Sequence, residues 1–248
     1  MIKIKKGLDI NLKGKASDVL LNGGKSESYA IVPDYYNGIT PKVVAKVGEK
    51  VKAGSVLMID KNRPEIKFVS PVSGEVTAVN RGEKRKVLSV VVKPEAQVEY
   101  EDFGKKNVAS LKREEVKEAI QQAGMWPFIK QRPYDIVASP ADEPRDIFVS
   151  AFYSAPLAPN FDFIVKGQEA DFQAGLDALA KLTDGKVYVG IRKGSSVSVK
   201  GVETVEVEGP HPAANVGVQI NHIKPVNKGE VVWTVNPADV IVIGRLFN

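Results

Sequence analysis

Hydrophobic positions follow two patterns along this chain, with short alternating runs in the first third and longer continuous runs in the rest. Between residues 29 and 95, the runs YAIVP, KVVAKV, SVLMI, IKFVS, GEVTAV and VLSVVVK are separated by Gly48, Gly54, Gly74 and Gly82. Val, Ile, Phe and Tyr favour strands, and glycine marks the turns between them. We expect this region to be a compact barrel or sandwich of short strands.

Strand-like and helix-like segments alternate in the rest of the chain. The expected strands are YDIVAS, DIFVSAFY, KVYVGIR, GVETVEVEG and EVVWTVN, and continuous apolar runs of this kind are typical of strands buried on both faces. In EADFQAGLDALAKLTDG, the residues Phe172, Leu176, Leu179 and Leu182 recur at helical spacing. Residues 213–223 and the segment PADVIVIGRLF are further expected helices. This alternation predicts an α/β domain with a mainly parallel, Rossmann-like sheet.

We expect two domains with an irregular start and a linker between them. The divisions are residues 1–28 (irregular segment), 29–95 (barrel-sandwich hybrid module), 96–110 (linker) and 111–248 (Rossmann-like α/β domain). A helix capped by Ser110 and stopped at Gly124 opens the second domain. The ending GRLFN lies inside an apolar helical pattern without a breaker, so we expect the natural protein to continue beyond Asn248.

The composition excludes several kinds of site. The chain has no cysteine and only two histidines, which rules out a disulfide, a thiolate nucleophile and an iron–sulfur cluster of its own, and we expect no metal site. No apolar run reaches the ~18–20 residues that span a bilayer. The start MIKIKKGLDI lacks the apolar core of a signal peptide. These features are typical of a cytoplasmic protein.

The positive charge is concentrated in the β-rich third. Residues 1–99 hold 18 Lys and Arg against 11 Asp and Glu, whereas residues 100–248 hold 17 against 19. A positive field favours anionic partners such as acidic protein surfaces or lipid headgroups, with a solvated lysine-rich surface as the alternative. The lysines are scattered without an aromatic stacking pattern, so we expect no nucleic-acid partner.

The α/β half lacks the glycines that a dinucleotide site needs. Such sites place glycines at a strand-to-helix turn, where backbone N–H groups meet the pyrophosphate. Here the turns read PADEPRD and SAPLAPN, in which proline removes N–H donors and acidic side chains repel phosphate. The segment KVYVGIRKGSSVSV, with Ser195 and Ser196, is the best phosphate-cradle candidate, and an ordinary turn is the alternative.

The segment GPHPAANVGVQINH supplies a candidate polar site. His211 precedes an expected helix start at Pro212, where free N–H groups can bind an anion or a polar ring. We name His211, Asn215 and His222 as this site; the alternative is that His211 and Asn215 only cap and orient the chain. No Ser–His–Asp set, carboxylate pair or metal-ligand spacing can be assembled, so we assign no catalytic residue and expect the isolated chain not to be catalytic.

The phrases VGEKVKAGSVL and SPVSGEVTAV resemble the lipoyl and biotinyl carrier fold, a pair of β-hammerheads. In those carriers a lysine on a tight hairpin holds the swinging arm. The matching segment DKNRPEI offers Lys61, but Arg63 and Pro64 lengthen and disturb the turn. We expect no covalently bound group, and a carrier module stays open as an alternative.

Five segments in order resemble one family. They are IKIKKGLDI, VGEKVKAGSVLMIDKNRPEIKFVSPVSGEV, FVSAFYSAPLAP, GPHPAANVG and VVWTVNPADVIVIGRLF. Together they are similar to the A subunit of the Na+-translocating NADH:quinone reductase, over essentially the full chain, which would be about the N-terminal half of a family member. That family is related to the C subunit of Rnf complexes and to the flavin-carrying NADH-binding subunit of respiratory complex I.

The resemblance implies a peripheral subunit on the cytoplasmic side of the bacterial inner membrane. The complex of that family passes electrons from NADH through flavins to ubiquinone or menaquinone and exports Na+. The implied role is docking on the membrane-bound B subunit and on the other subunits, and assisting quinone reduction. Flavins and NADH belong to the whole complex, and whether a quinone contacts this subunit stays open. The alternative is that the α/β half binds flavin, NADH or quinone in its own right.

This sequence departs from the family pattern in two places. Tyr153-Ser154-Ala155 stands where the family pattern has Asp-Thr-Asn, and Gln219 to His222 replaces a more histidine-rich stretch. Both departures argue against a fixed small ligand at these segments. We expect docking through the basic residues of the β-rich module, which are Lys61, Arg63, Arg81, Lys84, Arg85 and Lys86.

Overall fold

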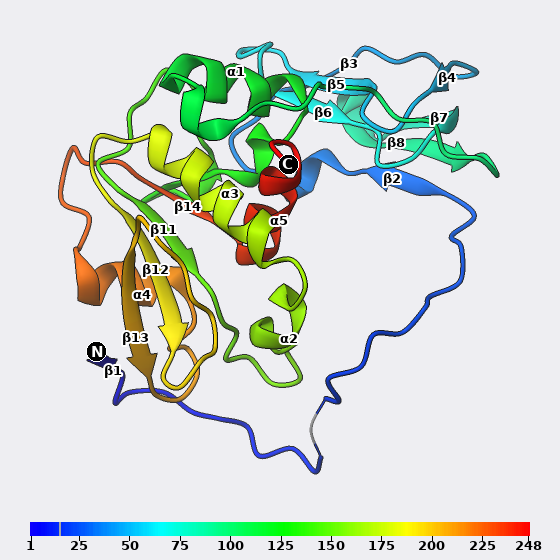
Figure 1. Ribbon diagram of the computed structural model, residues 1–248. Coiled ribbons are helices and arrows are strands. Elements are labelled where there is room, and N and C mark those ends of the chain that lie inside the picture. Colours follow the sequence, from blue (N-terminus) through cyan, green and yellow to red (C-terminus); the bar gives the residue numbers. More distant parts are fainter. Residues whose placement is uncertain (15) are drawn as a thin grey trace.

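The structure is a computed structural model that describes residues 1–14 and 16–248, with a β-rich first domain and an α/β second domain (Figure 1). Two antiparallel sheets form the first domain. The strand order of the first sheet is β2 (Tyr29–Ile31), β8 (Val87–Pro94), β7 (Gly74–Arg81) and β4 (Lys50–Val51). The strand order of the second sheet is β3 (Pro41–Val43), β5 (Val56–Asp60) and β6 (Lys67–Val69). Leu57 of β5 packs in one core cluster with Val76 of β7 and Val90 of β8, so the two sheets bury a common interior. The expected barrel-sandwich is confirmed.

A seven-stranded sheet forms the second domain. Its order is β1 (Ile2–Lys3), β13 (Glu203–Glu208), β12 (Val187–Arg192), β11 (Ile147–Ser150), β14 (Val232–Val235), β9 (Lys130–Arg132) and β10 (Ile136–Val137). Neighbouring strands from β1 to β14 are parallel, whereas β9 and β10 are antiparallel to their neighbours. Every residue of β11 and of β14 is buried, as expected for central strands covered on both faces. The mainly parallel α/β sheet is confirmed.

Helices cover both faces of this sheet. The α-helices of the described residues are α1 (Arg113–Gln122), α2 (Phe161–Val165), α3 (Glu169–Lys181), α4 (Val216–Ile223) and α5 (Pro237–Arg245), and the 3-10 turns are η1 (Pro33–Tyr35), η2 (Glu83–Arg85), η3 (Val108–Ser110) and η4 (Trp126–Phe128). Figure 1 shows α3 and α5 side by side over one face. Phe148 of β11 points to the other face, where it clusters with Ile220 of α4. Among the residues described, no helix is long and apolar enough to cross a bilayer.

Two glycines allow α3 and α5 to pack backbone against backbone. A Cβ atom at Gly175 of α3 would lie 2.0 Å from the carbonyl oxygen of Val240, and one at Gly244 of α5 would lie 1.7 Å from that of Asp171. Distances this short exclude any side chain, so both positions require glycine. The close crossing holds the first turn of α5 in a fixed place at the end of β14.

The two domains share one hydrophobic core. Met58, Ile66 and Phe68 from the β5–β6 hairpin cluster with Trp126 of η4. Arg63 reinforces this junction, since its guanidinium donates hydrogen bonds to the Asp60 carboxylate, to the Gly38 carbonyl (2.7 Å) and to the Val137 carbonyl (3.3 Å). The junction therefore places η1 of the first domain against the sheet of the second.

The first strand of the second domain differs from the expectation. The run YDIVAS predicts a strand buried on both faces, but only Ile136–Val137 is a strand, at the sheet edge and antiparallel to β9. The chain turns back immediately before it, with Asp135 in the left-handed conformation at φ 53°. The polar strand β9, which no apolar pattern predicts, occupies the position next to β14 instead.

The start of the first helix also differs. Helix α1 is capped at Lys112, whose N–H donates to the Glu115 carboxylate (2.8 Å), whereas Ser110 is the last residue of η3 and its hydroxyl donates to the Asn107 carbonyl (2.9 Å). In the N-terminal segment, Ile2–Lys3 pairs with β13 and extends the sheet of the second domain.

Candidate functional site

The strand order of the large sheet reverses between β11 and β14, which makes this position a topological switch point. From β11 the chain adds β12 and then β13 on one side, and it then returns through α4 to add β14 on the other side of β11. In open α/β sheets, ligands bind at the carboxyl ends of the strands at such a switch point. The fold therefore favours a site where β11 and β14 end.

A cavity of about 760 Å³ lies at this switch point. Its wall combines the ends of β11 and β14 with the first turns of α4 and α5, strand β9, and the residues at η1. The polar side chains of the wall include Tyr36, Lys130, Arg132, Tyr153, Asn236 and Asp239. Because η1 belongs to the first domain, both domains build the cavity.

Asn236 organises one wall of the cavity. It is the N-cap of α5, and its side-chain oxygen accepts hydrogen bonds from the Ala238 N–H (3.0 Å) and from the Tyr153 hydroxyl (3.2 Å). Pro237 takes the first helical position, where a missing N–H costs nothing. Burial raises the pKa of Tyr153, so its phenol stays protonated at neutral pH. Tyr153 is thus a neutral side chain held at the cavity by the helix cap.

Lys130 projects from β9 toward the first domain. Its ammonium nitrogen lies 5.0 Å from the centroid of the Tyr36 ring, a cation–π contact between the domains. Burial lowers the pKa of Lys130, and the carboxylates of Asp135 and Asp239 act in the opposite direction. Burial likewise raises the pKa of Tyr36. The cavity therefore holds a cation that is only partly solvated.

Asp239 is the most perturbed group of the cavity. It lies in the first turn of α5, and burial raises the pKa of its carboxyl to about 6, although the charge of Lys130 acts to lower it. Desolvation therefore outweighs the attraction of the ammonium group. This carboxyl therefore titrates close to neutral pH, whereas an ordinary aspartate, with a pKa of about 3.9, is fully ionised there.

A buried polar network fixes the floor beneath α4. The Ser150 hydroxyl donates to the Ala214 carbonyl (2.8 Å), and the Gln219 side chain donates to Ser150 (2.9 Å) and to the Ala213 carbonyl (3.1 Å). Gln219 fits only because its neighbour on β12 is Gly190, where a Cβ would lie 2.1 Å from the Gln219 oxygen. These bonds hold the start of α4 at the end of β11.

The polar site proposed from sequence is only partly brought together. Asn215 lines the cavity as the N-cap residue of α4. His211 lies outside the cavity lining. Its ring Nδ1 is 3.0 Å from the Ser154 hydroxyl, and its backbone N–H donates to the Asp9 carboxylate (2.8 Å). His222 is exposed in the last turn of α4, with its Nδ1 2.8 Å from the Val218 carbonyl. The three residues do not face one common site.

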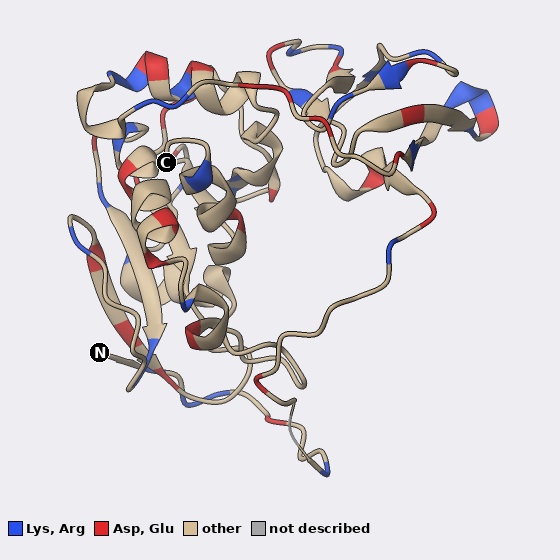
Figure 2. Cartoon of the chain, turned by 45° about the vertical axis from the view of Figure 1, so that its right-hand side comes forward, with Lys and Arg blue, Asp and Glu red and all other residues tan. Residues whose placement is uncertain are grey.

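The basic residues proposed for docking have different surroundings. Arg63 is engaged at the domain junction, whereas Lys61 beside it is exposed. The exposed residues Arg81, Lys84, Arg85 and Lys86 surround η2 at the tip of the β7–β8 hairpin. Figure 2 shows this turn at the outer end of the first domain, away from the α/β domain. Four of the six proposed residues are therefore grouped at the hairpin tip, with Glu83 among them.

Phosphate and metal chemistry have little support in the described residues. The turn at Gly194 leads through irregular chain to β13 rather than into a helix, and the Ser195 hydroxyl bonds to Asp162 (2.5 Å). The turn after β11 carries Pro156 and Pro159, and the turn after β14 is Asn236-Pro237. Within residues 1–14 and 16–248, no group of three or more His, Cys, Asp or Glu side chains could hold a metal ion.

Three central residues of the cavity, Tyr36, Lys130 and Asp239, are not singled out by sequence reasoning. One signal was present for Asp239, because an acidic residue follows Asn236-Pro237 at a strand-to-helix turn, where switch-point sites lie. Lys130 and Tyr36 give no such signal. They reach the cavity through an unexpected strand and through the contact between the domains.

The fold and cavity define a class of protein: a barrel-sandwich module joined to a doubly wound α/β domain whose switch point lacks a glycine-rich phosphate turn. Two family models match this arrangement, the NqrA N-terminal barrel-sandwich hybrid domain over residues 2–95 and the NqrA second alpha/beta domain over residues 111–248. The chain belongs to the NqrA family.

Relatives with a known name agree with this family. The chain is 39% identical to the A subunit of the Na(+)-translocating NADH-quinone reductase of Neisseria meningitidis, and 40% identical to the subunits of the same name from Vibrio atlanticus and Hahella chejuensis. Each alignment covers the whole of this chain and 56% of the relative. The chain thus spans about half the length of these curated relatives. The resemblance drawn from the sequence motifs is confirmed.

Proposed function

We propose that this chain is the docking and ligand-binding half of the A subunit in a Na+-pumping NADH:quinone reductase. It docks on the membrane-bound B subunit at the cytoplasmic side of the bacterial inner membrane, and its switch-point cavity holds the ring of a quinone. The observation that carries the proposal is the combination of family membership over both domains with a partly apolar cavity built by both. The oxidation of NADH and the transport of Na+ belong to the assembled complex.

The basic hairpin tip supports the docking role. Lys84 and Arg85 adopt positive φ angles of 50° and 62°, a conformation that non-glycine residues rarely adopt, and it turns a group of cations outward. Lys86 forms an ion pair with Asp34 (2.7 Å), which anchors the turn to η1. An anchored, cationic turn is suited to an acidic protein surface, where charge complementarity steers association.

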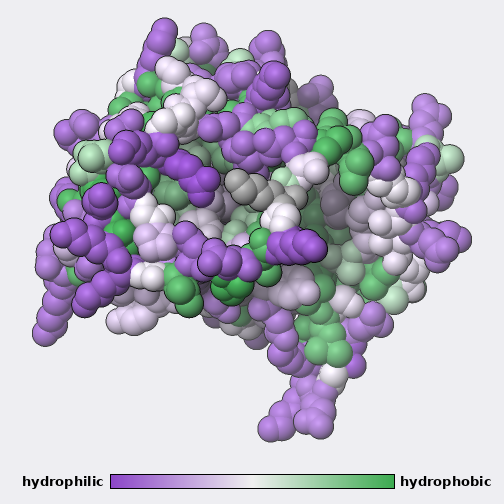
Figure 3. All heavy atoms as spheres, turned by 90° about the horizontal axis from the view of Figure 1, so that it is seen from below, coloured by the Kyte–Doolittle hydropathy of each residue, from purple (hydrophilic) through white to green (hydrophobic). Residues whose placement is uncertain are grey.

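An apolar stretch of the N-terminal segment provides a second docking surface. Its exposed large side chains are Leu8, Ile10, Leu12, Val19, Leu20 and Leu21. Leu20 and Leu21 are 86% and 81% exposed, so this segment leaves large apolar area in water. Figure 3, which views the molecule from below, shows hydrophobic residues among hydrophilic ones on this face. Apolar surface exposed over several neighbouring residues is typical of an interface.

Co-purification of the full-length protein with the membrane-bound partners tests the docking role. We expect reversal of Arg81, Lys84, Arg85 and Lys86 to Glu to lower recovery of the complex by about tenfold or more, because like charges placed together cost several kcal/mol. Reversal of the exposed linker residues Lys105 and Lys106 is the matched control and should leave recovery unchanged. Full retention of the hairpin variant would contradict docking through this tip.

The cavity suits a quinone better than a nucleotide. Its aromatic side chains, which include Tyr36, Phe128, Phe152 and Tyr153, offer faces for a planar ring. The ammonium group of Lys130 is a donor that a ring carbonyl can accept from. NADH and flavin nucleotides carry phosphates, and the turns after β11 and β14 offer proline where backbone N–H groups would have to meet them.

Calorimetric titration of the purified chain tests the ligand assignment. We expect a short-chain ubiquinone to bind with one site per chain and NADH to show no saturable binding. Binding of NADH in place of the quinone would favour a nucleotide site of this chain's own. Absence of quinone binding would remove the ligand part of the proposal and leave the docking part in place.

A further inference from the structure

Among the described residues, none forms a hydrogen bond or an ion pair with the carboxyl group of Asp239, which lines the cavity. In the first turn of a helix an aspartate commonly accepts a backbone hydrogen bond or lies in solvent. In α5 the cap is already made by Asn236, which accepts the hydrogen bond from Ala238. Burial raises the pKa of the Asp239 carboxyl, and the charge of Lys130 acts to lower it. The group is desolvated and open to a ligand.

The cavity lining contains four charged side chains, which are Lys130, Arg132, Asp135 and Asp239. Arg132 Nη2 and Asp135 form an ion pair at 3.4 Å, whereas the buried Nε of Arg132 has no hydrogen-bond partner among the described residues. Lys130 and Asp239 interact through space, yet no ion pair within 4.0 Å joins them in the described chain. The remaining titratable groups of the lining are the phenols of Tyr35, Tyr36 and Tyr153, and burial raises the pKa of Tyr36 and of Tyr153.

A quinone ring carbonyl can form a hydrogen bond with Asp239 only when the carboxyl group is protonated. The carbonyl oxygen only accepts hydrogen bonds, and an ionised carboxylate also only accepts. The two groups therefore repel unless the carboxyl carries its proton, in which case its O–H donates to the ring. Lys130 and Arg132 can donate in their charged forms, whereas Asp239 can donate only in its acid form.

We propose, on the basis of the quinone assignment above, that Asp239 is the proton-linked specificity residue of the cavity, which binds a ring carbonyl only in its protonated form and takes a proton from solvent when the ligand enters. The linkage has a definite sign. Affinity is highest where Asp239 is protonated in the free protein, below pH about 6, and it falls as pH rises. If only the acid form binds, affinity decreases by up to about 100-fold between pH 5 and pH 8.

The chain offers a matched pair of variants. Asp239→Asn keeps the size of the side chain and a permanent N–H donor, but it cannot titrate. We expect it to bind quinone at every pH with about the affinity that the wild type has at pH 5. Asp135→Asn removes the other carboxylate of the cavity lining, which is already paired with Arg132, and we expect the pH dependence to remain.

Isothermal titration of the purified chain with a short-chain ubiquinone, between pH 5 and 8, measures the effect directly. At pH 7.5, repetition in phosphate and in Tris, buffers of different ionisation enthalpy, counts the protons taken up. We expect nearly one proton per ligand for the wild type and none for Asp239→Asn. Wild-type binding that is independent of pH, or pH dependence that persists in Asp239→Asn, would overturn the inference while the quinone assignment stands. Absence of binding at every pH would overturn both.

Discussion

The ammonium group of Lys130 lies 5.0 Å from the centre of the Tyr36 ring, and this contact joins the second domain to the first in the wall of the cavity. Tyr36 also packs edge-on against Phe68 of β6, with ring centroids 4.8 Å apart. The cation of the site is therefore positioned by a side chain from the barrel-sandwich module. This arrangement makes the module part of the site as well as a docking surface.

Replacement of Lys130 by Met tests its electrostatic role. Lys130 lowers the pKa of Asp239, so its removal leaves desolvation unopposed. We expect the Asp239 carboxyl to titrate above its present value of about 6, as measured by carbon-detected NMR of the side-chain carboxyl. Lys42→Met, an exposed lysine of β3, is the control and should not move the titration. A downward shift in Lys130→Met would contradict this account.

Replacement of Gly217 by Leu tests the location of the ligand. Gly217 lines the cavity, and the nearest atom to an added Cβ would be the Arg132 guanidinium at 3.9 Å, so a larger side chain fills the space without a clash. We expect quinone affinity to fall by about tenfold or more, because the leucine side chain occupies the space that the quinone ring would fill. The unfolding temperature should change little. Gly23→Leu, at a glycine with no atom within 4 Å, is the matched control. Equal binding by both variants would place the ligand elsewhere.

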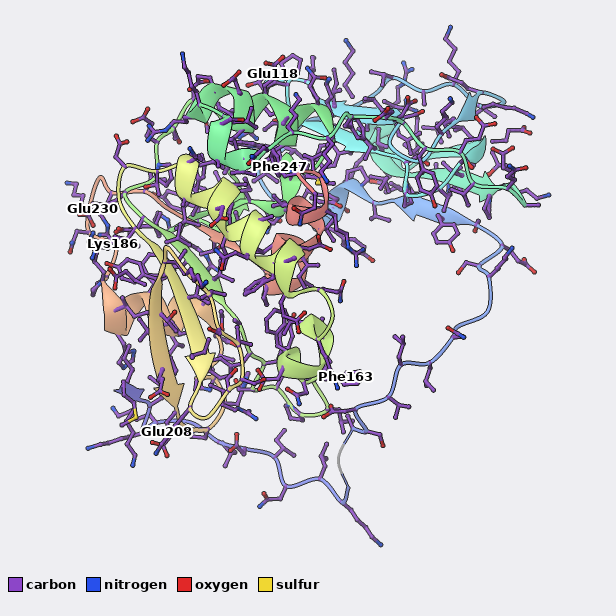
Figure 4. The ribbon with its side chains drawn as sticks, in the orientation of Figure 1. Glu118, Phe163, Lys186, Glu208, Glu230 and Phe247 are labelled. Atoms are coloured by element: carbon purple, nitrogen blue, oxygen red, sulfur yellow. The ribbon has the colours of Figure 1, made fainter. Side chains whose placement is uncertain are left out.

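Asp146 provides a test of stability at the opposite end of the sheet. Figure 4 shows Lys186 and Glu230 at this end, far from Phe163 and Glu208. Burial acts to raise the pKa of the Asp146 carboxyl, but hydrogen bonds from Lys224 (2.6 Å) and Arg145 (2.7 Å) outweigh it, and the pKa lies below its ordinary value. The ionised carboxylate therefore stabilises the native state.

We expect Asp146→Asn to lower the free energy of unfolding at pH 7 by about 2–3 kcal/mol, because two cations lose their common partner. Since the native pKa is depressed, this stabilisation is present above the ordinary pKa of about 3.9 and is lost as pH falls through the native value. Urea unfolding of the wild type and of Asp146→Asn measures the difference in their free energies of unfolding, which should become smaller between pH 7 and pH 3. Asp184→Asn, whose side chain is 85% exposed, is the control, with an expected change within about 0.5 kcal/mol. A constant difference at all pH values would contradict this assignment.

Local patterns account for most of the fold. Glycines at turns and alternating valines identify the barrel-sandwich strands, and helical spacing of Phe172, Leu176 and Leu179 identifies α3, because these signals act between near neighbours in sequence. Strand β9 carries no such signal. Its middle residue, Gln131, is buried because its side chain bonds to the Ser139 N–H (3.1 Å) and to the indole N–H of Trp233 (3.3 Å), partners that only the folded sheet supplies.

The candidate site was harder to foresee than the fold. The sequence predicts a helix start at Pro212, whereas α4 begins at Val216, so that Asn215 is its N-cap residue and lines the cavity. It also groups His222 with His211, although one lies in the last turn of α4 and the other precedes the helix. Six residues of α4, 216–221, precede His222, and a helix advances about 1.5 Å per residue, so the two histidines lie toward opposite ends of the helix.

The sequence by itself determined the two kinds of domain, the family and the absence of a dinucleotide turn, since each rests on residues close together in the chain. Only the tertiary structure decided that Tyr36, Lys130 and Asp239 meet in one cavity. They belong to a turn, an edge-side strand and a helix start, which the domain junction and the α3–α5 glycine crossing bring together. The pKa of Asp239 follows from that meeting, because desolvation depends on what surrounds a group in space and not on its neighbours in sequence.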